Sequence, residues 1–149
     1  MNKLFVFMMK FVIAICIFTV IFVASAYIGY LYITPTSYIS LKGTPSVEFT
    51  VNAFDRVIDI EADSEMGEII NDLELKNRNI SNAVQTTVNE LVSEGYISQN
   101  NNSSLIISVS NTDVNKANKM MKKLHDEIKI NLDGTDEIQM VKVETIIIK

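Results

Sequence analysis

The sequence is poor in the residues that cross-link small domains and build metal centres. It contains one cysteine, Cys16, and one histidine, His125, among 149 residues. A single cysteine forms no intramolecular disulfide, and a lone histidine lacks the partner thiols or imidazoles of a zinc site. The chain must therefore fold around a hydrophobic core of its own, which a domain of about 115 residues is large enough to provide.

Basic residues are also scarce and unevenly placed. The chain carries 13 Lys and Arg against 18 Asp and Glu, which gives a net charge of −5. Lys3 and Lys10 precede a long apolar run, so the remainder of the chain is more acidic than the total indicates. Because an acidic domain repels phosphate backbones, nucleic acid is not expected as a partner.

Motifs that carry catalysis or ligand binding are missing as well. The five glycines are spaced too widely to build a phosphate-binding loop or a nucleophile elbow. Asp59, Glu61 and Asp63 alternate as on the outer face of a strand and lack the glycine of a calcium loop. His125 lies on a helix with no histidine or cysteine to assist it. We therefore expect no catalytic residue, no metal, no cofactor and no small-molecule substrate, and the protein is not expected to be an enzyme.

Apolar residues are abundant at the N-terminus. Residues 11–33 contain no charge, and a helix of that length reaches about 34 Å, enough to cross a hydrocarbon core of about 30 Å. The two lysines before the run favour a cytoplasmic N-terminus. The sequence therefore predicts a short cytoplasmic tail at residues 1–10, a single transmembrane helix at 11–33 and an extracytoplasmic domain at 34–149 in the cell membrane.

A secretory signal peptide is the alternative interpretation of this run. Ala24, Ser25 and Ala26 have the small-residue pattern of a cleavage site, and cleavage near Ala26 would release a secreted domain. The apolar run continues for seven residues beyond Ala26, which favours an uncleaved anchor. Both interpretations place the domain outside the cytoplasm.

The rest of the chain has the periodicities of an α+β domain. Val47, Phe49 and Val51 alternate with polar residues, as in a half-buried strand. In residues 56–62 the alternation predicts Ile58, Ile60 and Ala62 on one face and Val57 on the other. Strands are predicted at 37–41, 45–52, 56–62, 104–110 and 138–148, and helices at 64–73, 80–92 and 114–128. The order βββααβαβ predicts a small, mainly antiparallel sheet with helices packed on one face.

Three helix ends carry local signals. Ser64 is expected to cap the first helix of the domain, and Gly95 is expected to end the second. Asn111 or Thr112 is expected to cap the third.

The segment from Tyr38 to Ala62 resembles the start of the extracytoplasmic (middle) domain of RsgI-type anti-sigma factors. In that family a membrane helix and a strand precede a Pro-Ser-hydrophobic-Glu segment, followed by Val-Asn and a strand that begins Arg/Lys-Val. The matching residues here are Pro45, Ser46, Val47, Glu48, Val51, Asn52, Arg56 and Val57. The resemblance continues more weakly to about Leu132, so it covers most of the domain.

The resemblance implies self-cleavage at an Asn-Pro bond before the serine, and here the sequence departs from the pattern. The family cleavage-motif position is occupied by Thr44, Pro45, Ser46 and Glu48. Asparagine breaks its following bond when its side-chain amide closes a succinimide ring, and Thr44 has no amide. We therefore expect this position to be inactive.

A second departure concerns the cytoplasmic side. The resemblance implies a sigma-binding domain before the membrane helix, and the ten residues that precede the helix here are too few to fold as one. The sequence therefore favours a membrane-anchored signalling or interaction module that binds the membrane and another envelope or anti-sigma protein. A self-cleaving envelope signalling protein and a truncated anti-sigma remnant are the alternatives.

Overall fold

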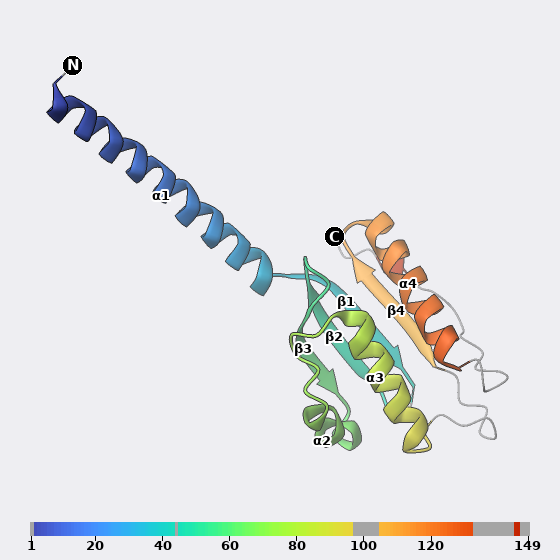
Figure 1. Ribbon diagram of the computed structural model, residues 1–149. Helices are drawn as coiled ribbons and strands as arrows, with labels where there is room; N and C mark the ends of the chain where they lie inside the picture. The colour runs from blue at the N-terminus through green and yellow to red at the C-terminus, as the bar shows by residue number, and fades with distance from the viewer. Residues whose placement is uncertain (1, 44, 97–104, 133–144, 147–149) are drawn as a thin grey trace. The chain divides into compact units, whose positions relative to one another are not determined.

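The computed structural model describes residues 2–43, 45–96, 105–132 and 145–146 (Figure 1). It divides into two compact units, Met1–Thr34 and Pro35–Lys149. The first unit is formed by one helix, α1 (Lys3–Ile33), which is long and apolar enough to cross a membrane. No residue of α1 is buried, so its apolar side chains point outward on all sides, as lipid contact requires. The single cysteine, Cys16, is one of these exposed residues.

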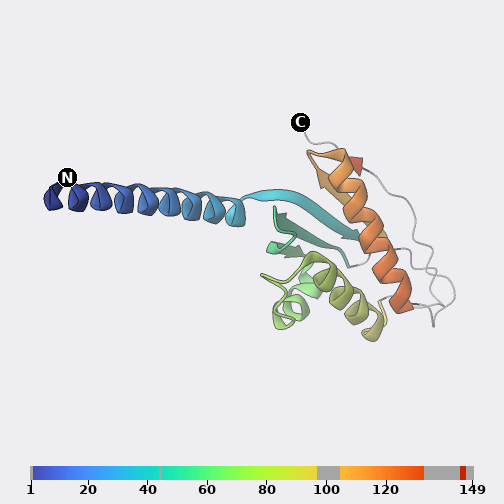
Figure 2. The same ribbon diagram turned by 45° about the horizontal axis from the view of Figure 1, so that its top comes forward.

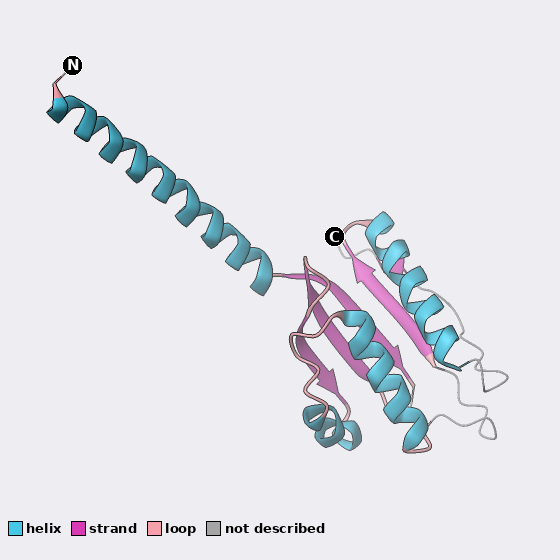
Figure 3. Ribbon diagram, in the orientation of Figure 1, coloured by secondary structure: helices cyan, strands magenta, loops and turns pink. Residues whose placement is uncertain are grey.

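The second unit is built on a five-stranded sheet (Figure 3). Its order across the sheet is β3-β2-β1-β4-β5, with β1 in the centre. The first four strands pair antiparallel, and β5 pairs parallel to β4. The strands are β1 (Pro35–Lys42), β2 (Val47–Asn52), β3 (Val57–Ala62), β4 (Ile106–Asn111) and β5 (Thr145–Ile146).

Helices cover one face of this sheet, as Figures 1 and 2 show for α3 and α4. The helices are α2 (Ser64–Asp72), α3 (Ile80–Ser93) and α4 (Val114–Leu132). Phe49 and Leu41 of the sheet are fully buried and join Leu91 of α3 and Leu124 of α4 in one hydrophobic core. The predicted α+β class, its element order and the one-sided packing of the helices are confirmed.

The register of the β2–β3 hairpin corrects one prediction. Thr50 pairs with Asp59, but Val51 pairs with Val57, so the pairing shifts by one residue at this point and Ile58 is the extra residue. Such a bulge reverses the alternation on one side of itself. Val57 therefore faces the core with Ile60 and is 1% exposed, instead of pointing to the opposite face.

The helix ends also differ in part from the sequence prediction. The residue that caps α2 is Asp63, not Ser64. Asp113, and neither Asn111 nor Thr112, caps α4, because its carboxylate accepts hydrogen bonds from the backbone N–H groups of Asn115 and Lys116. The prediction for α3 is confirmed, since the helix stops at Ser93 before a left-handed Gly95.

The predicted last strand is described only where β5 lies. Thr145 and Ile146 form the edge of the sheet next to β4, and the rest of the 138–148 prediction falls outside the described residues.

Replacement of Phe49 by alanine should test the core most directly. Phe49 is a large side chain with 0% exposure in the central part of the sheet, and such truncations destabilise by about 3–5 kcal/mol. The loss should be measured by urea unfolding of the full chain in detergent micelles, with resistance to protease as the signal of the folded state. Thr50→Ala on the opposite face of the same strand is the matched control and should cost less than about 1 kcal/mol. Equal losses for the two variants would contradict the assigned core.

Candidate functional site

The family cleavage-motif position lies at the start of β2. Thr44 falls outside the described residues, so the structure adds nothing on its side chain. Pro45 is buried and Ser46 is half-buried, while Val47 begins the strand with its side chain in the core. Glu48 follows on the outer face and is exposed. The predicted residues from Pro45 to Glu48 are therefore adjacent, but they point to different sides of the sheet.

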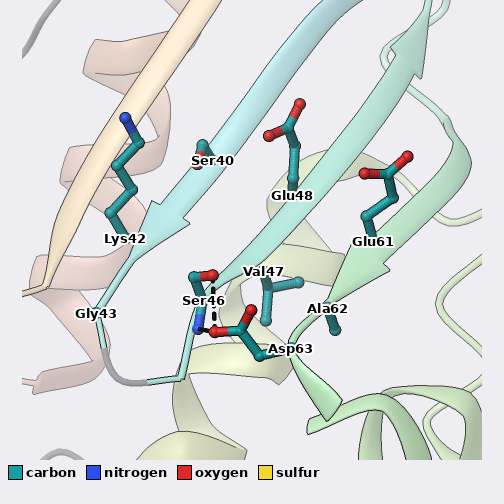
Figure 4. Close-up of a pocket in the computed structure, with 9 residues that line it drawn as sticks. All are labelled: Ser40, Lys42, Gly43, Ser46, Val47, Glu48, Glu61, Ala62 and Asp63. Carbon is teal, nitrogen blue, oxygen red and sulfur yellow. Dashed lines mark hydrogen bonds between the residues drawn. The ribbon is translucent and has the colours of Figure 1, made fainter.

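Ser46 is bound to Asp63 at the end of β3. The backbone N–H and the hydroxyl of Ser46 both donate to Oδ2 of Asp63, each at 2.9 Å (Figure 4). The backbone N–H of Asp63 donates in return to the carbonyl of Ser46 at 3.1 Å. These three bonds fasten the residue before β2 to the residue that caps α2. Asp63 thus uses its carboxylate across the hairpin, and it makes no side-chain cap bond to α2.

The bonds to Asp63 bear on whether the Ser46 hydroxyl could act as a nucleophile. The N–H of Ser46, and next its hydroxyl, lower the pKa of the Asp63 carboxyl by stabilising its ionised form. A carboxylate with a lowered pKa is a weaker general base. Among the described residues, Asp63 is the side chain that accepts from the Ser46 hydroxyl, and its lowered pKa makes it a weaker base for activating a serine nucleophile.

An open depression of about 520 Å³ lies beside this contact on the helix-free face of the sheet (Figure 4). Glu48 and Glu61 stand on neighbouring strands as direct cross-strand partners, and Ser40 is the partner of Glu48 on the other side. Lys42 projects from the end of β1 at the rim. Two carboxylates placed directly opposite one another repel each other. The free-energy cost of this repulsion must be offset by stabilising contacts elsewhere in the domain.

The remaining polar candidates lie apart on the surface. Asp59 forms an exposed ion pair with Lys76 at 2.9 Å, a contact that also lowers the pKa of its carboxyl. His125 is exposed on α4, with Nδ1 at 3.4 Å from the Asp126 carboxylate. Within the described ranges, no three His, Cys, Asp or Glu side chains are grouped so as to hold a metal ion.

The Ser46–Asp63 contact was missed by the sequence analysis. Its only signal is the hairpin register, which pairs Val47 with Ala62 and so brings Ser46 opposite Asp63. An uninterrupted pairing continued from Val51 and Val57 would have placed Ala62 there instead. The bulge at Ile58 therefore determines which residue meets the serine.

Replacing Asp63 by asparagine should change the pH dependence of stability. Because the folded pKa of Asp63 lies below its unfolded value, the carboxylate stabilises the fold above the ordinary aspartate pKa of about 4. That contribution is lost as pH falls through the lower folded value. The difference in unfolding free energy between wild type and Asp63→Asn should therefore shrink at acid pH, measured by urea unfolding at several pH values.

Ser46→Ala is the matched variant for this measurement. It removes the hydroxyl and keeps the backbone N–H, which has the larger effect on the Asp63 pKa, so its pH profile should lie between those of wild type and Asp63→Asn. Parallel profiles for all three proteins would show that ionisation of Asp63 does not contribute to stability through this contact.

The proteins to which this sequence is similar include anti-sigma factors. Residues 36–148 match the model of the anti-sigma factor RsgI-like central domain. The anti-sigma-I factor RsgI7 of Acetivibrio thermocellus is 22% identical over 120 residues, which is 80% of this chain and 22% of that protein. The anti-sigma-I factor RsgI9 of the same organism is 31% identical over 98 residues, which is 65% of this chain and 14% of that protein. The chain thus spans less than a quarter of the length of either relative. Since the match to the family model extends over nearly all of the second unit, the chain belongs to the family that contains the anti-sigma factor RsgI-like central domain.

Proposed function

We propose that the chain is a membrane-anchored signalling module whose domain of residues 35–149 lies outside the cytoplasm and binds another envelope or anti-sigma protein. The observation that carries the proposal is the RsgI-like central domain directly after one helix able to span a membrane. The relatives bear the name of anti-sigma-I factors. A role in the same kind of signalling is therefore the first function to test.

A contact function is favoured over catalysis by the geometry of the described residues. Ser46 is held by a carboxylate of lowered pKa, and His125 is exposed on the surface of α4. Among the described residues, the two are not hydrogen-bonded to one another as a nucleophile and its base would be, since each contacts a separate carboxylate, Asp63 or Asp126. Within residues 1–149 we therefore assign protein binding to the domain and to α1.

The edge at β5 is the binding surface that we propose for the domain. Among the strands of the described residues, β5 ends the sheet on one side, and an added strand from a partner would extend the ladder there. The opposite edge is partly occupied by the chain itself. The N–H of Val57 in β3 donates to the carbonyl of Arg78, and the N–H of Asn77 donates to the carbonyl of Val57.

The orientation that we propose places α1 with its N-terminus in the cytoplasm. Lys3 and Lys10 lie before or at the start of the uncharged run, and no lysine or arginine follows until Lys42. Positive charge next to a membrane helix favours the cytoplasmic side. We propose an uncleaved anchor, and cleavage near Ala26 is the alternative that the experiments below separate by mass.

A photo-reactive amino acid at position 145 should test the partner and its surface. If β5 is the binding edge, irradiation of living cells should link the full chain to another membrane or envelope protein, identified by mass spectrometry. The same amino acid at exposed Asp72 on α2 is the matched control and should give little of that product. Adducts with cytosolic proteins alone would contradict the orientation, and no protein adduct at position 145 would contradict the binding edge.

Self-cleavage at the motif position is proposed to be absent because Thr44 replaces the asparagine of the family pattern. The wild-type chain should run as one band on a denaturing gel after expression in membranes. Thr44→Asn restores the side-chain amide before Pro45 and should yield two fragments split at that bond. Thr44→Gln is the matched control, since its longer amide closes a six-membered ring less readily, and it should remain intact.

Two outcomes would overturn this interpretation. Wild-type fragments that end at Thr44 would favour the self-cleaving alternative. An intact Thr44→Asn chain would show that residue 44 is not what separates this protein from the family pattern.

A further inference from the structure

One end of the domain is joined to the membrane helix by a single residue. α1 ends at Ile33 and β1 begins at Pro35, so Thr34 alone lies between them. One residue spans at most about 3.6 Å. At any angle between helix and sheet, the residues beside Pro35 must therefore lie close to the level at which the apolar helix ends.

The strand registers identify what else lies at this end of the domain. Pro35 pairs with Asn52, the last residue of β2, so the β2–β3 turn is here. Ser37 pairs with Asn111, so β4 ends here and α4 starts here. The N–H of Ile80 donates to the carbonyl of Asp55 at 2.8 Å, which brings the start of α3 to the same turn. Figure 1 shows these segments together at the end of the sheet where β1 begins.

Two large apolar side chains are exposed at this end. Phe54, in the β2–β3 turn, is 46% exposed, and Val114, the first residue of α4, is 39% exposed. In the described part of the domain only Tyr38 and Val92 are also exposed large hydrophobic residues. An exposed phenylalanine in a tight turn gains free energy when it leaves water, and the boundary between lipid headgroups and acyl chains offers that environment.

Positive charge accompanies the apolar pair. The only arginines of the chain, Arg56 and Arg78, are both exposed beside the β2–β3 turn. Arg56 donates through Nη1 to the carbonyl of Asn77 at 2.7 Å, which holds the segment that carries Arg78 against the turn. Lys116 adds a third basic group in the first turn of α4, and Asp55 and Asp113 are the acids nearby. The guanidinium groups suit phosphate oxygens, which they bind with two parallel hydrogen bonds.

We infer that this end of the domain is a membrane-binding surface, in which Phe54 and Val114 enter the headgroup region and Arg56 and Arg78 bind the phosphates of anionic lipids. The inference rests on the proposed membrane anchor, because α1 brings the surface to the bilayer. The anchor and the surface together bind the domain at two places.

A tryptophan reporter tests this surface well, because the natural chain contains no tryptophan. The full chain with Phe54→Trp is reconstituted in vesicles of phosphatidylcholine and phosphatidylglycerol. The tryptophan emission should lie at a shorter wavelength than that of a tryptophan exposed to water. Lipids brominated near the headgroup should reduce its intensity. Val92→Trp is the matched control, because Val92 lies about 18 Å along α3 from Ile80. Its emission should show neither effect.

Two further variants separate the possible failures. Phe18→Trp reports on α1 and should be quenched by brominated acyl chains whenever the anchor is in the bilayer. Quenching of Phe18→Trp without any quenching of Phe54→Trp overturns the surface and leaves the anchor intact, whereas an unquenched Phe18→Trp overturns the anchor itself. All variants should resist protease as the wild type does, which shows that the domain is folded.

The arginines are tested in the Phe54→Trp background. Arg56→Gln combined with Arg78→Gln should reduce the quenching in vesicles that contain phosphatidylglycerol. In vesicles of phosphatidylcholine alone, the same pair of changes should have a smaller effect. Unchanged quenching in both vesicles would overturn the assignment of the arginines to lipid phosphate.

Discussion

The position of β1 constrains the rest of the domain. This strand is hydrogen-bonded on both sides, to β2 and to β4, and it begins one residue after the membrane helix ends. Its inward residues Ile39 and Leu41 are fully buried beneath the helices. A strand that is central in the sheet cannot leave it without breaking two ladders of hydrogen bonds. The covalent link to the membrane therefore enters the domain at its most strongly held element.

Periodicity was sufficient to predict most of this architecture. Val47, Phe49 and Val51 alternate with polar residues and are all buried, and Gly95 ends α3 as a left-handed residue should. These features depend on neighbours in sequence, so local patterns reveal them. The family resemblance around Pro45 to Glu48 likewise depends on a short run of residues, and the match over residues 36–148 confirms it.

The sequence-based predictions for β3 were wrong where one extra residue shifts the pairing of β2 with β3. The bulge at Ile58 turns Val57 toward the core and places Asp63 opposite Ser46. The sequence of residues 56–62 does not predict the bulge, since the pairing with the bulge and the uninterrupted pairing bury a similar number of apolar side chains. The two predicted helix N-caps were wrong because Asp63 and Asp113 cap a helix at least as well as their neighbours Ser64 and Thr112, and only the tertiary structure decides between them. The sequence therefore selected the residues of the candidate site, but it did not predict the contact between Ser46 and Asp63.

A buried polar contact links the strand that leaves the membrane helix to α4. Asn111 donates through Nδ2 to the hydroxyl of Ser37 at 2.6 Å, and both residues are almost fully buried. The other amide atom of Asn111, Oδ1, accepts from the N–H of Asp113 at 2.7 Å. Asp113 in turn caps α4. Because an unmade hydrogen bond in such a place is costly, a shift of β1 along its axis disturbs the start of α4 as well. The contact therefore joins the strand that follows α1 to the first turn of α4.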